Sequence, residues 1–461
     1  MAVMSQSVML KYLETQPRLT KNQYRLILMA VVCNLLEFYD FFMIGFVLAF
    51  VAGPWMLTYG QSAVVLLSSG IGSMLGAGFS GWLADRIGRR KVLTATILTF
   101  SVGTGILALT PDKAWIFLSV FRFVVGLGVG GLYSVILPLV QEFVPTSKRG
   151  SVSGIVTAAV PLGLGLGALL GAVLGPIVGW RGLFALGLVP APLIVLIRVW
   201  MPESPHWLLQ MGRAEEARKS LAWAVEINQE QIPLPPSEPE AQSATWGELF
   251  DYPRSLAVSW IGNLAAQTGV YGLYLWVPTL FMEELRITPA RASYLMIYCS
   301  AGAFIGRVVF SYLSEALGRR LSGGLYGFGA ALFVILTASL HNSYWGSVSV
   351  FWLLMMVTFF FADGGFAIVG PYAAEVWPAH LRASGMGSAY GFGGIGKIIG
   401  PLGLALIVGS SDVIKPQASV AKIVPAFLYL AAWFGLAGIV YGFFGMETKG
   451  RSIEEISAEL Q

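Results

Sequence analysis

Charged residues are scarce in this sequence. Asp, Glu, Lys and Arg together make up 12% of its 461 residues, whereas 56% of the residues are hydrophobic and the mean hydropathy is +0.71. Globular proteins usually carry about a quarter charged residues, and a soluble fold has no place to bury so much apolar surface. The composition therefore excludes a soluble globular protein and indicates one that lies in a lipid bilayer.

Cysteine and histidine are rarer still. Cys33 and Cys299 both fall inside apolar runs, which argues against a disulfide framework. The three histidines, His206, His341 and His380, are too far apart to suggest a metal site. The sequence also lacks a nucleotide-binding loop, a recognisable catalytic nucleophile and a basic run typical of nucleic-acid-binding arms. We therefore predict no metal, no cofactor, no nucleic-acid partner and no enzymatic activity.

Long apolar runs recur along the chain. A helical run of about 20 residues is long enough to span a hydrocarbon core of roughly 30 Å. The runs cover 25–50, 61–83, 92–110, 114–141, 151–174, 181–200, 255–282, 291–314, 322–340, 346–374, 383–409 and 423–446. The glycines of "GLGVGG" (126–131) fall inside one of these runs, where glycine permits close helix packing and not dinucleotide binding. We therefore predict an all-α, multi-pass membrane protein with twelve transmembrane helices.

Polar segments divide the chain into five parts. We expect an N-terminal segment (1–24), a first six-helix bundle (25–200), a central loop (201–253) with a helix-like stretch at 212–227, a second six-helix bundle (254–446) and a C-terminal tail (447–461). Most of the 29 basic residues fall on the side that holds both termini. By the positive-inside rule that side is cytoplasmic. The absence of a long outer loop suggests a bacterial inner membrane, and we expect the protein to act as a monomer.

The two bundles repeat each other in sequence. "PLVQEFVPTSKR" (138–149) and "PYAAEVWPAHLR" (371–382) share Pro, Glu, Pro and Arg at matching places, and "GWLADRIGRR" (81–90) is echoed by "SYLSEALGRR" (311–320). Parallel six-helix halves are a known transporter architecture, in which the substrate site lies between the halves near the membrane midplane. The repeat therefore predicts two pseudo-symmetric bundles with a central site.

The same motifs carry a family resemblance over the whole chain. "GWLADRIGRRK" resembles the signature loop of the major facilitator superfamily, and "PESPHWLL" (202–209) and "ETKGRSIEEI" (447–456) resemble loop motifs of its sugar porters and organic-ion carriers. Glu37-Phe38-Tyr39-Asp40 resembles the paired acids in the first span of aromatic-acid:proton symporters and nicotinate permeases. It departs from them in having Glu first and the bulky Phe38 where Gly is usual. The resemblance implies the major facilitator fold and transport by alternating access.

Two carboxylates in the first apolar run are candidates for proton coupling. Glu37 and Asp40 are spaced i, i+3 and share one helix face. Charged groups inside a membrane are costly and usually functional, and two close carboxylates do not both ionise easily. The pair is therefore expected to take up and release the coupling proton, with packing alone as the alternative. Arg122, deep in the fourth run, is expected to pair with Asp40 or Glu37 or else to bind a substrate carboxylate directly.

The second half carries two midplane charges and one near its edge. Lys397 is expected to anchor an anionic substrate, as a basic residue in the same span of organic-anion carriers appears to do. The alternative is an ion pair with Asp363 that only joins two helices. Arg307 is expected to extend its side chain to the cytoplasmic membrane surface.

Aromatic and amide side chains complete the predicted substrate site. Asn263, Gln267, Tyr271 and Tyr274 form one helical stripe. Tyr39, Tyr372 and Tyr390 add further rings, which suit a flat substrate. For each tyrosine, packing against other helices or lipid is the alternative role.

The family motifs imply ion networks at the cytoplasmic ends of the halves. Asp85 is expected to cap a neighbouring helix or to meet Arg149, and Arg86 and Arg89 are expected to meet Glu142. The second half repeats the plan with four residues: Glu315, Arg319, Glu375 and Arg382. Such networks would hold the halves together in the outward-facing state and part in the inward-facing state. They also contribute to the positive-inside charge.

These features predict a secondary transporter. We expect proton-coupled symport of a small organic anion, such as nicotinate or a benzoate, with the proton as the coupling ion and the lipid bilayer as its surroundings. Within the same fold, the alternatives are a sugar:proton symporter and a drug:proton antiporter. The sequence has Gln267 where sugar porters show a denser amide set, and "AAVPLGLGLG" (158–167) departs from the antiporter motif. A non-transporting receptor on the same fold would be expected to lose the midplane charges.

Overall fold

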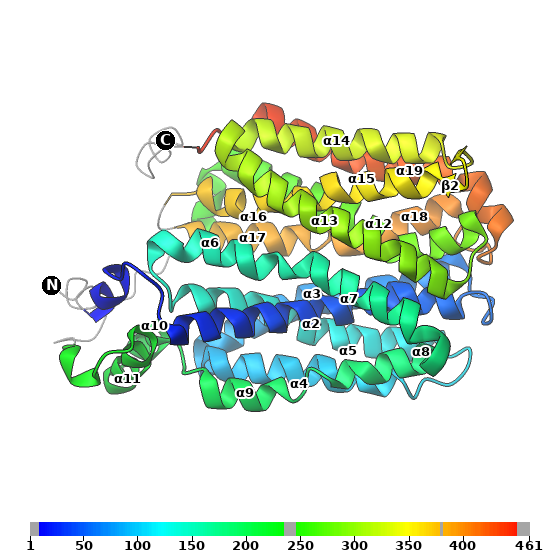
Figure 1. Ribbon diagram of the computed structural model, residues 1–461. Coiled ribbons are helices and arrows are strands. Elements are labelled where there is room, and N and C mark those ends of the chain that lie inside the picture. The colour runs from blue at the N-terminus through cyan, green and yellow to red at the C-terminus, as the bar shows by residue number, and fades with distance from the viewer. Residues whose placement is uncertain (1–8, 235–245, 379–380, 450–461) are drawn as a thin grey trace.

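The computed structural model describes residues 9–234, 246–378 and 381–449. Two helical bundles lie side by side (Figure 1). The first contains α2 (Lys21–Val51), α3 (Tyr59–Ile87), α4 (Arg89–Leu107), α5 (Trp115–Gln141), α6 (Thr146–Thr157), α7 (Ala159–Val173), α8 (Gly175–Ala185), η1 (Leu186–Leu188) and α9 (Leu193–Trp200). The second contains α12 (Pro253–Leu285), α13 (Pro289–Leu317), α14 (Arg319–Ser339), α15 (Val350–Gly364), α16 (Phe366–Glu375), α17 (Arg382–Gly393), α18 (Gly396–Val408), α19 (Pro416–Ile439) and the π-helical η5 (Val440–Phe444). A small antiparallel hairpin, β1 (Tyr344–Trp345) and β2 (Val348–Ser349), joins α14 to α15.

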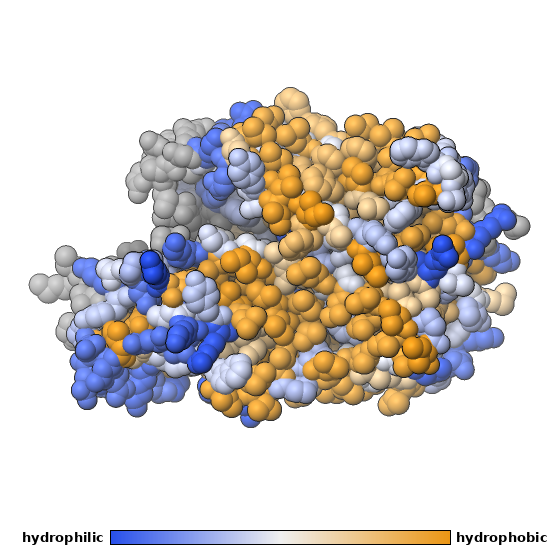
Figure 2. Space-filling model, in the orientation of Figure 1, coloured by the Kyte–Doolittle hydropathy of each residue, from blue (hydrophilic) through white to orange (hydrophobic). Residues whose placement is uncertain are grey.

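The twelve predicted runs coincide with these helices. Within the described residues, ten helical segments are long and apolar enough to cross a membrane. The other two runs fall on α4, which opens with three basic residues, and on α12, which is 33 residues long and carries the amide and tyrosine stripe. Their polar residues lower the mean hydropathy of helices that are otherwise long enough to span. Apolar residues form a band across both bundles, and hydrophilic residues gather at the two ends (Figure 2).

Proline interrupts the helix that leads from α6 to α7. Pro161 has no backbone N–H, so the carbonyl of Thr157, four residues earlier, loses its helical partner. Arg307 of the second bundle donates a hydrogen bond to this carbonyl. Ser300 Oγ, also on α13, donates to the Pro161 carbonyl at 2.6 Å. The break therefore presents two acceptors of the first bundle to α13 of the second.

Glycine allows the closest helix crossing of the first bundle. The "GLGVGG" segment lies on α5, where a Cβ atom at Gly126 or Gly130 would collide with the carbonyl oxygen of Ser69 or Ser73 on α3. Only glycine lets the two backbones approach so closely. The close-packing interpretation of this segment is confirmed.

The ends of the molecule differ in how the bundles meet. We call the end that carries α10 (Pro205–Gln210) and α11 (Ala214–Val225) the proximal end and the opposite end the distal end (Figure 1). At the distal end, the 57–60 segment of the first bundle bonds to the 410–414 segment of the second. Ile414 N–H donates to the Leu57 carbonyl at 3.0 Å, Tyr59 N–H to the Asp412 carbonyl at 2.9 Å and Gly60 N–H to the Ser410 carbonyl at 2.8 Å. We call this main-chain contact the distal clasp.

The proximal end has a small hydrophobic cluster of its own. α11 confirms the helix expected at 212–227, although it is shorter, and 3-10 turns η2 (Gln229–Gln231) and η3 (Trp246–Asp251) follow. Met9 and Leu13 from the start of the chain pack with Trp207, Leu221 and Val225 of the central loop. The N-terminal segment is therefore attached to the central loop. Most of the Pro-rich tract at 233–240 lies outside the described residues.

Candidate functional site

The expected pairing of Arg122 with Asp40 is present between α5 and α2. Both residues are fully buried, and Arg122 Nη1 lies 3.9 Å from Asp40 Oδ2. The guanidinium also donates to the main-chain carbonyls of Asp40 at 3.2 Å and Phe41 at 2.9 Å. Arg122 thus binds the α2 backbone as well as the carboxylate. A change in the charge of Asp40 would leave the arginine attached to α2 through these carbonyls.

Glu37 lies one turn earlier on α2, and its electrostatic partners differ from those of Asp40. It is fully buried, and neither of its carboxylate oxygens has a hydrogen-bond partner among the described residues. Lys397 of α18 attracts its carboxylate, and Asp40 repels it. The two acids therefore interact with each other and with different cations.

Lys397 reaches from the second bundle to the first. Its Nζ donates to Ser73 Oγ on α3 at 3.0 Å and lies 5.6 Å from the ring centre of Phe41 and 5.1 Å from that of Tyr271. The residue is only half-buried. A cation near aromatic faces is attracted by their negative centres. The sequence placed Lys397 near the midplane but gave no sign of its contact with α3.

Asp363 pairs with Arg307 and not with Lys397. Arg307 Nε donates to Asp363 Oδ2 at 2.8 Å and Nη2 to Oδ1 at 2.9 Å, and Tyr274 OH donates to Oδ1 at 2.8 Å. Arg307 is 7% exposed, so the expectation that it extends to the membrane surface is wrong. α13 continues ten residues beyond it to Leu317, which leaves Arg307 too deep to reach water and makes Asp363 its partner.

The two tyrosines of the α12 stripe lie along the contact with the first bundle, and its two amides contact the second bundle. Tyr271 packs edge-on against Phe41, with ring centres 5.4 Å apart, and Tyr274 packs against Phe42 at 5.3 Å. Gln267 packs against Gly393 at the end of α17. Asn263 donates to the Ser259 carbonyl of its own helix at 3.1 Å, and its side-chain oxygen has no hydrogen-bond partner among the described residues.

The other three predicted tyrosines make different contacts. Tyr39 is buried within the first bundle, where its OH reaches the Leu183 carbonyl at 3.5 Å. Tyr372 lies at the proximal end, and its OH donates to the Met446 carbonyl at 2.9 Å. Tyr390 lies against Gly370 and interacts electrostatically with Tyr271. Of the tyrosines, Tyr271 therefore has the most direct contact with the central lysine.

The ion network of the first half differs in part from the expected one. Arg89 meets Glu142 at 2.8 Å, as expected, and Asp85 lies 4.0 Å from Arg89. Arg86 instead covers the ring of Trp82 at 4.1 Å, because it points out of the bundle. Arg149 meets Glu14 at 3.7 Å and the Gln141 carbonyl at 2.9 Å, in place of Asp85.

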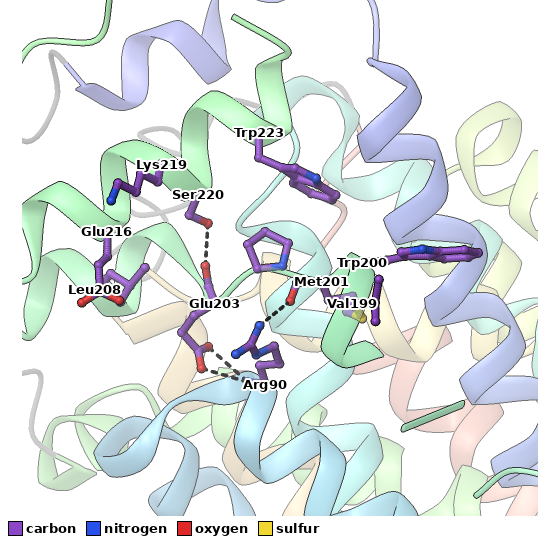
Figure 3. Close-up of a pocket in the computed structure, with 11 residues that line it drawn as sticks. Arg90, Val199, Trp200, Met201, Glu203, Leu208, Glu216, Lys219, Ser220 and Trp223 are labelled. Atoms are coloured by element: carbon purple, nitrogen blue, oxygen red, sulfur yellow. Dashed lines mark hydrogen bonds between the residues drawn. The ribbon is translucent and has the colours of Figure 1, made fainter. Parts of the chain in front are cut away.

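Glu203 caps the start of α4, which the sequence did not indicate. Its Oε1 accepts from the backbone N–H groups of Arg89 at 2.9 Å and Arg90 at 3.1 Å (Figure 3). Ser220 Oγ of α11 donates to the Glu203 carbonyl at 2.6 Å. A carboxylate at a helix N-terminus is favoured by the helix dipole. The central loop is thereby held against the α3–α4 turn.

The network of the second half repeats this arrangement. Arg319 makes two hydrogen bonds with Glu375, at 3.1 and 3.0 Å, and meets Glu315 at 2.8 Å. Glu447 accepts from the N–H groups of Arg319 at 2.9 Å and Arg320 at 3.2 Å. Partial burial opposes ionisation of Glu447, but these backbone donors lower its pKa below the usual value. The side chain of Arg382 lies outside the described residues.

Each network lies within its own half of the molecule in this structure. Arg89, Glu142 and Glu203 belong to the first half and its following loop, whereas Arg319, Glu375 and Glu447 belong to the second. The Arg89–Glu142 and Arg319–Glu375 ion pairs each join helices of the same half. The expected change of the networks between the outward- and inward-facing states stays a prediction. Near the first network, burial together with Arg149 and Arg89 lowers the pKa of His206 to about 4.

Comparisons with known proteins give consistent matches over nearly the full chain. A family model described as "Sugar (and other) transporter" matches residues 26–460. The niacin transporter NiaP of Acinetobacter baylyi is 28% identical over 423 residues, which are 90% of this chain and 91% of that protein. The cis,cis-muconate transport protein of the same species is 25% identical, over 82% of this chain and 83% of that protein.

Sugar carriers are also similar to this chain. The glucose transporter GlcP of Staphylococcus epidermidis is 26% identical, over 95% of this chain and 98% of that protein. Among solved structures, a partially occluded inward open conformation of the xylose transporter XylE from E. coli superposes with a TM-score of 0.71, at 18% identity, over 94% of this chain and 100% of that one. The fold expected from the sequence motifs, the major facilitator fold, is confirmed.

Proposed function

Because this chain belongs to the family of sugar and other transporters, we propose that it takes up a small aromatic or heteroaromatic monocarboxylate, such as nicotinate or a benzoate, together with protons. The niacin and muconate transporters among its relatives support an organic-anion substrate. No cofactor is needed, since the proton gradient supplies the driving force.

The position of Lys397 carries this proposal. Its half-buried ammonium lies between the two bundles, bonds to Ser73 and is flanked by the rings of Phe41 and Tyr271. A carboxylate that displaced the weak Ser73 contact would gain a charge-assisted hydrogen bond. An aromatic ring attached to that carboxylate would lie against the flanking rings, where stacking contributes further binding energy. A flat aromatic acid matches this combination of groups.

Proton coupling is assigned to Asp40. Its carboxylate and the Arg122 guanidinium are fully buried and are 3.9 Å apart at their closest charged atoms. Protonation of Asp40 would remove the charge that attracts Arg122 and weaken the contact between α5 and α2. Such a change alters the packing of the helices that line the centre, as alternating access requires.

The orientation follows from charge and from the inter-bundle contacts. The basic residues of the two ion networks lie at the proximal end, so this end faces the cytoplasm by the positive-inside rule. The distal clasp then closes the outer side. A monomer in a bacterial inner membrane is sufficient for this mechanism, because both halves are in one chain.

The proposal is tested by uptake of radiolabelled nicotinate and benzoate into proteoliposomes, with and without an inward proton gradient. We expect accumulation that depends on the gradient. Lys397→Ala should abolish it, and Lys415→Ala, which removes an exposed lysine outside the helices, should not. Equal uptake by the Lys397→Ala variant would contradict the assignment of Lys397.

A sugar:proton symporter is the second candidate. The full-length similarity to GlcP favours it. Competition decides between the two: excess glucose or xylose should leave nicotinate uptake unchanged. If sugars are accumulated and nicotinate is not, the second candidate is correct.

A further inference from the structure

Glu37 is a buried charge that the helices around it do not satisfy. It is 0% exposed, and both carboxylate oxygens lack a hydrogen-bond partner among the described residues. Burying an ionised carboxylate in this way is strongly unfavourable unless an opposite charge compensates it. Lys397 comes from the other half of the molecule and approaches this side of α2: its Nζ lies 5.6 Å from the ring centre of Phe41, one turn beyond Glu37.

The surroundings of Glu37 contain few other titratable groups. Cys33 and Asp40 lie on the same helix, and Tyr271 faces it from α12. Asp40 is already attracted by Arg122. Glu37 is therefore the acid of the two that forms no ion pair among the described residues.

We propose that Glu37 and the carboxylate of the substrate are alternative partners of Lys397. This inference rests on the proposed function and assigns a separate role to the second acid of the pair. With no substrate bound, ionised Glu37 balances the lysine. When the substrate anion binds to Lys397, Glu37 takes one proton from water on its carboxylate oxygen and becomes neutral.

Charge balance gives the reason for this exchange. The empty site holds one negative and one positive charge, and so does the site with a substrate anion, Lys397 and protonated Glu37. An anion that arrived while Glu37 stayed ionised would place two negative charges beside one positive charge in a buried site, which is strongly unfavourable. One proton therefore enters the centre with each anion, independently of Asp40.

The first test is equilibrium binding of nicotinate to the purified transporter as a function of pH. In the wild type, affinity should rise as pH falls, by up to about tenfold per pH unit where Glu37 is ionised in the empty state. Glu37→Gln should bind nicotinate tightly with almost no dependence on pH. Glu37→Asp should keep the dependence, and so should Asp40→Asn. A slope that survives in Glu37→Gln and disappears in Asp40→Asn would overturn the proposal.

Nicotinamide, which lacks the carboxylate, serves as the matched ligand. It has no negative charge to compete with Glu37, so any binding should not change with pH in the wild type or in Glu37→Gln. A pH slope for nicotinamide equal to that for nicotinate would also overturn the proposal, because the exchange requires an anion.

The second test needs no substrate and separates this inference from the proposed function. Unfolding temperatures are measured for substrate-free wild type, Glu37→Gln, Lys397→Met and the double variant. Each single variant should unfold at a lower temperature, because it leaves one buried charge without its partner. The double variant should lose much less than the sum of the two. Additive losses would show that the two groups do not compensate each other, even if nicotinate proves not to be the substrate.

Discussion

Replacing Asp363 with Asn should destabilise the protein strongly. The carboxylate receives two hydrogen bonds from Arg307, at 2.8 and 2.9 Å, and the side chains are 1% and 8% exposed. The variant keeps the shape but leaves a guanidinium charge in a buried place without its counter-ion. Breaking one partner of such a pair costs about 3–5 kcal/mol. The variant also replaces the carboxylate oxygen that accepts the hydrogen bond of Tyr274 OH with a neutral amide group.

The size of the effect can be measured by unfolding in mixed micelles of SDS and dodecyl maltoside. The double variant Asp363→Leu/Arg307→Met removes both charges and should recover much of the loss, because no buried charge is then unpaired. The matched control is Glu216→Gln, which breaks an exposed ion pair with Arg213 at 2.6 Å and should have little effect on stability, because water screens exposed charges. If Asp363→Asn were no more harmful than this control, the pair would be hydrated and our account of Arg307 would be incorrect.

Four further predictions concern separate parts of the molecule. Asp40→Asn should lower the gradient-driven accumulation of nicotinate in proteoliposomes, because one of the two coupling protons is lost, but should spare its exchange; accumulation equal to that of the wild type would contradict the proton assignment. Gly130→Leu should lower the unfolding free energy by about 1–3 kcal/mol, because its side chain collides with the α3 backbone, whereas Gly78→Ala on the open face of α3 should be neutral in the same assay. Glu203→Ala should lower the free energy of unfolding by about 1 kcal/mol, because α4 loses its cap, and thermal unfolding measures this change. An unchanged stability would show that water replaces the carboxylate. His206 takes up a proton near pH 6.5 when unfolded but only near about 4 when folded, so its contribution to stability should be lost as pH falls through this interval; the pH dependence of unfolding should flatten in His206→Asn.

The sequence allowed the helices to be predicted because membrane burial leaves a local signal. Each run of apolar residues had to be long enough to span, and glycines inside a run indicated close packing, as at Gly130 against α3. Arg122 and Asp40 were also predictable as partners, since a cation deep in a span needs an anion at a similar depth. These inferences depend only on depth along a helix.

Contacts that depend on the direction of a side chain around its helix were harder to predict. The sequence placed Asp363 and Lys397 near the midplane but Arg307 near the cytoplasmic edge, so Lys397 was the partner that depth suggested for Asp363. Extending α13 by three residues beyond the predicted end would have placed Arg307 deeper and favoured the observed pair. The contact of Lys397 with Ser73 requires knowledge of how the two halves meet, and a single sequence does not contain it.

The distal clasp determines which amino-acid substitutions the outer end can tolerate. Its three hydrogen bonds join main-chain N–H groups to main-chain carbonyls, so the identity of the side chains in 57–60 and 410–414 contributes little to them. Alanine scanning across these loops should therefore reveal the contact at Gly60, where a Cβ atom would lie 2.8 Å from the Ser410 carbonyl oxygen that accepts the hydrogen bond. Proline at Tyr59, Gly60 or Ile414 should also break the contact, because it removes the donor itself. Related chains can thus close in the same way, provided that these three positions keep their N–H groups and position 60 stays free of a side chain.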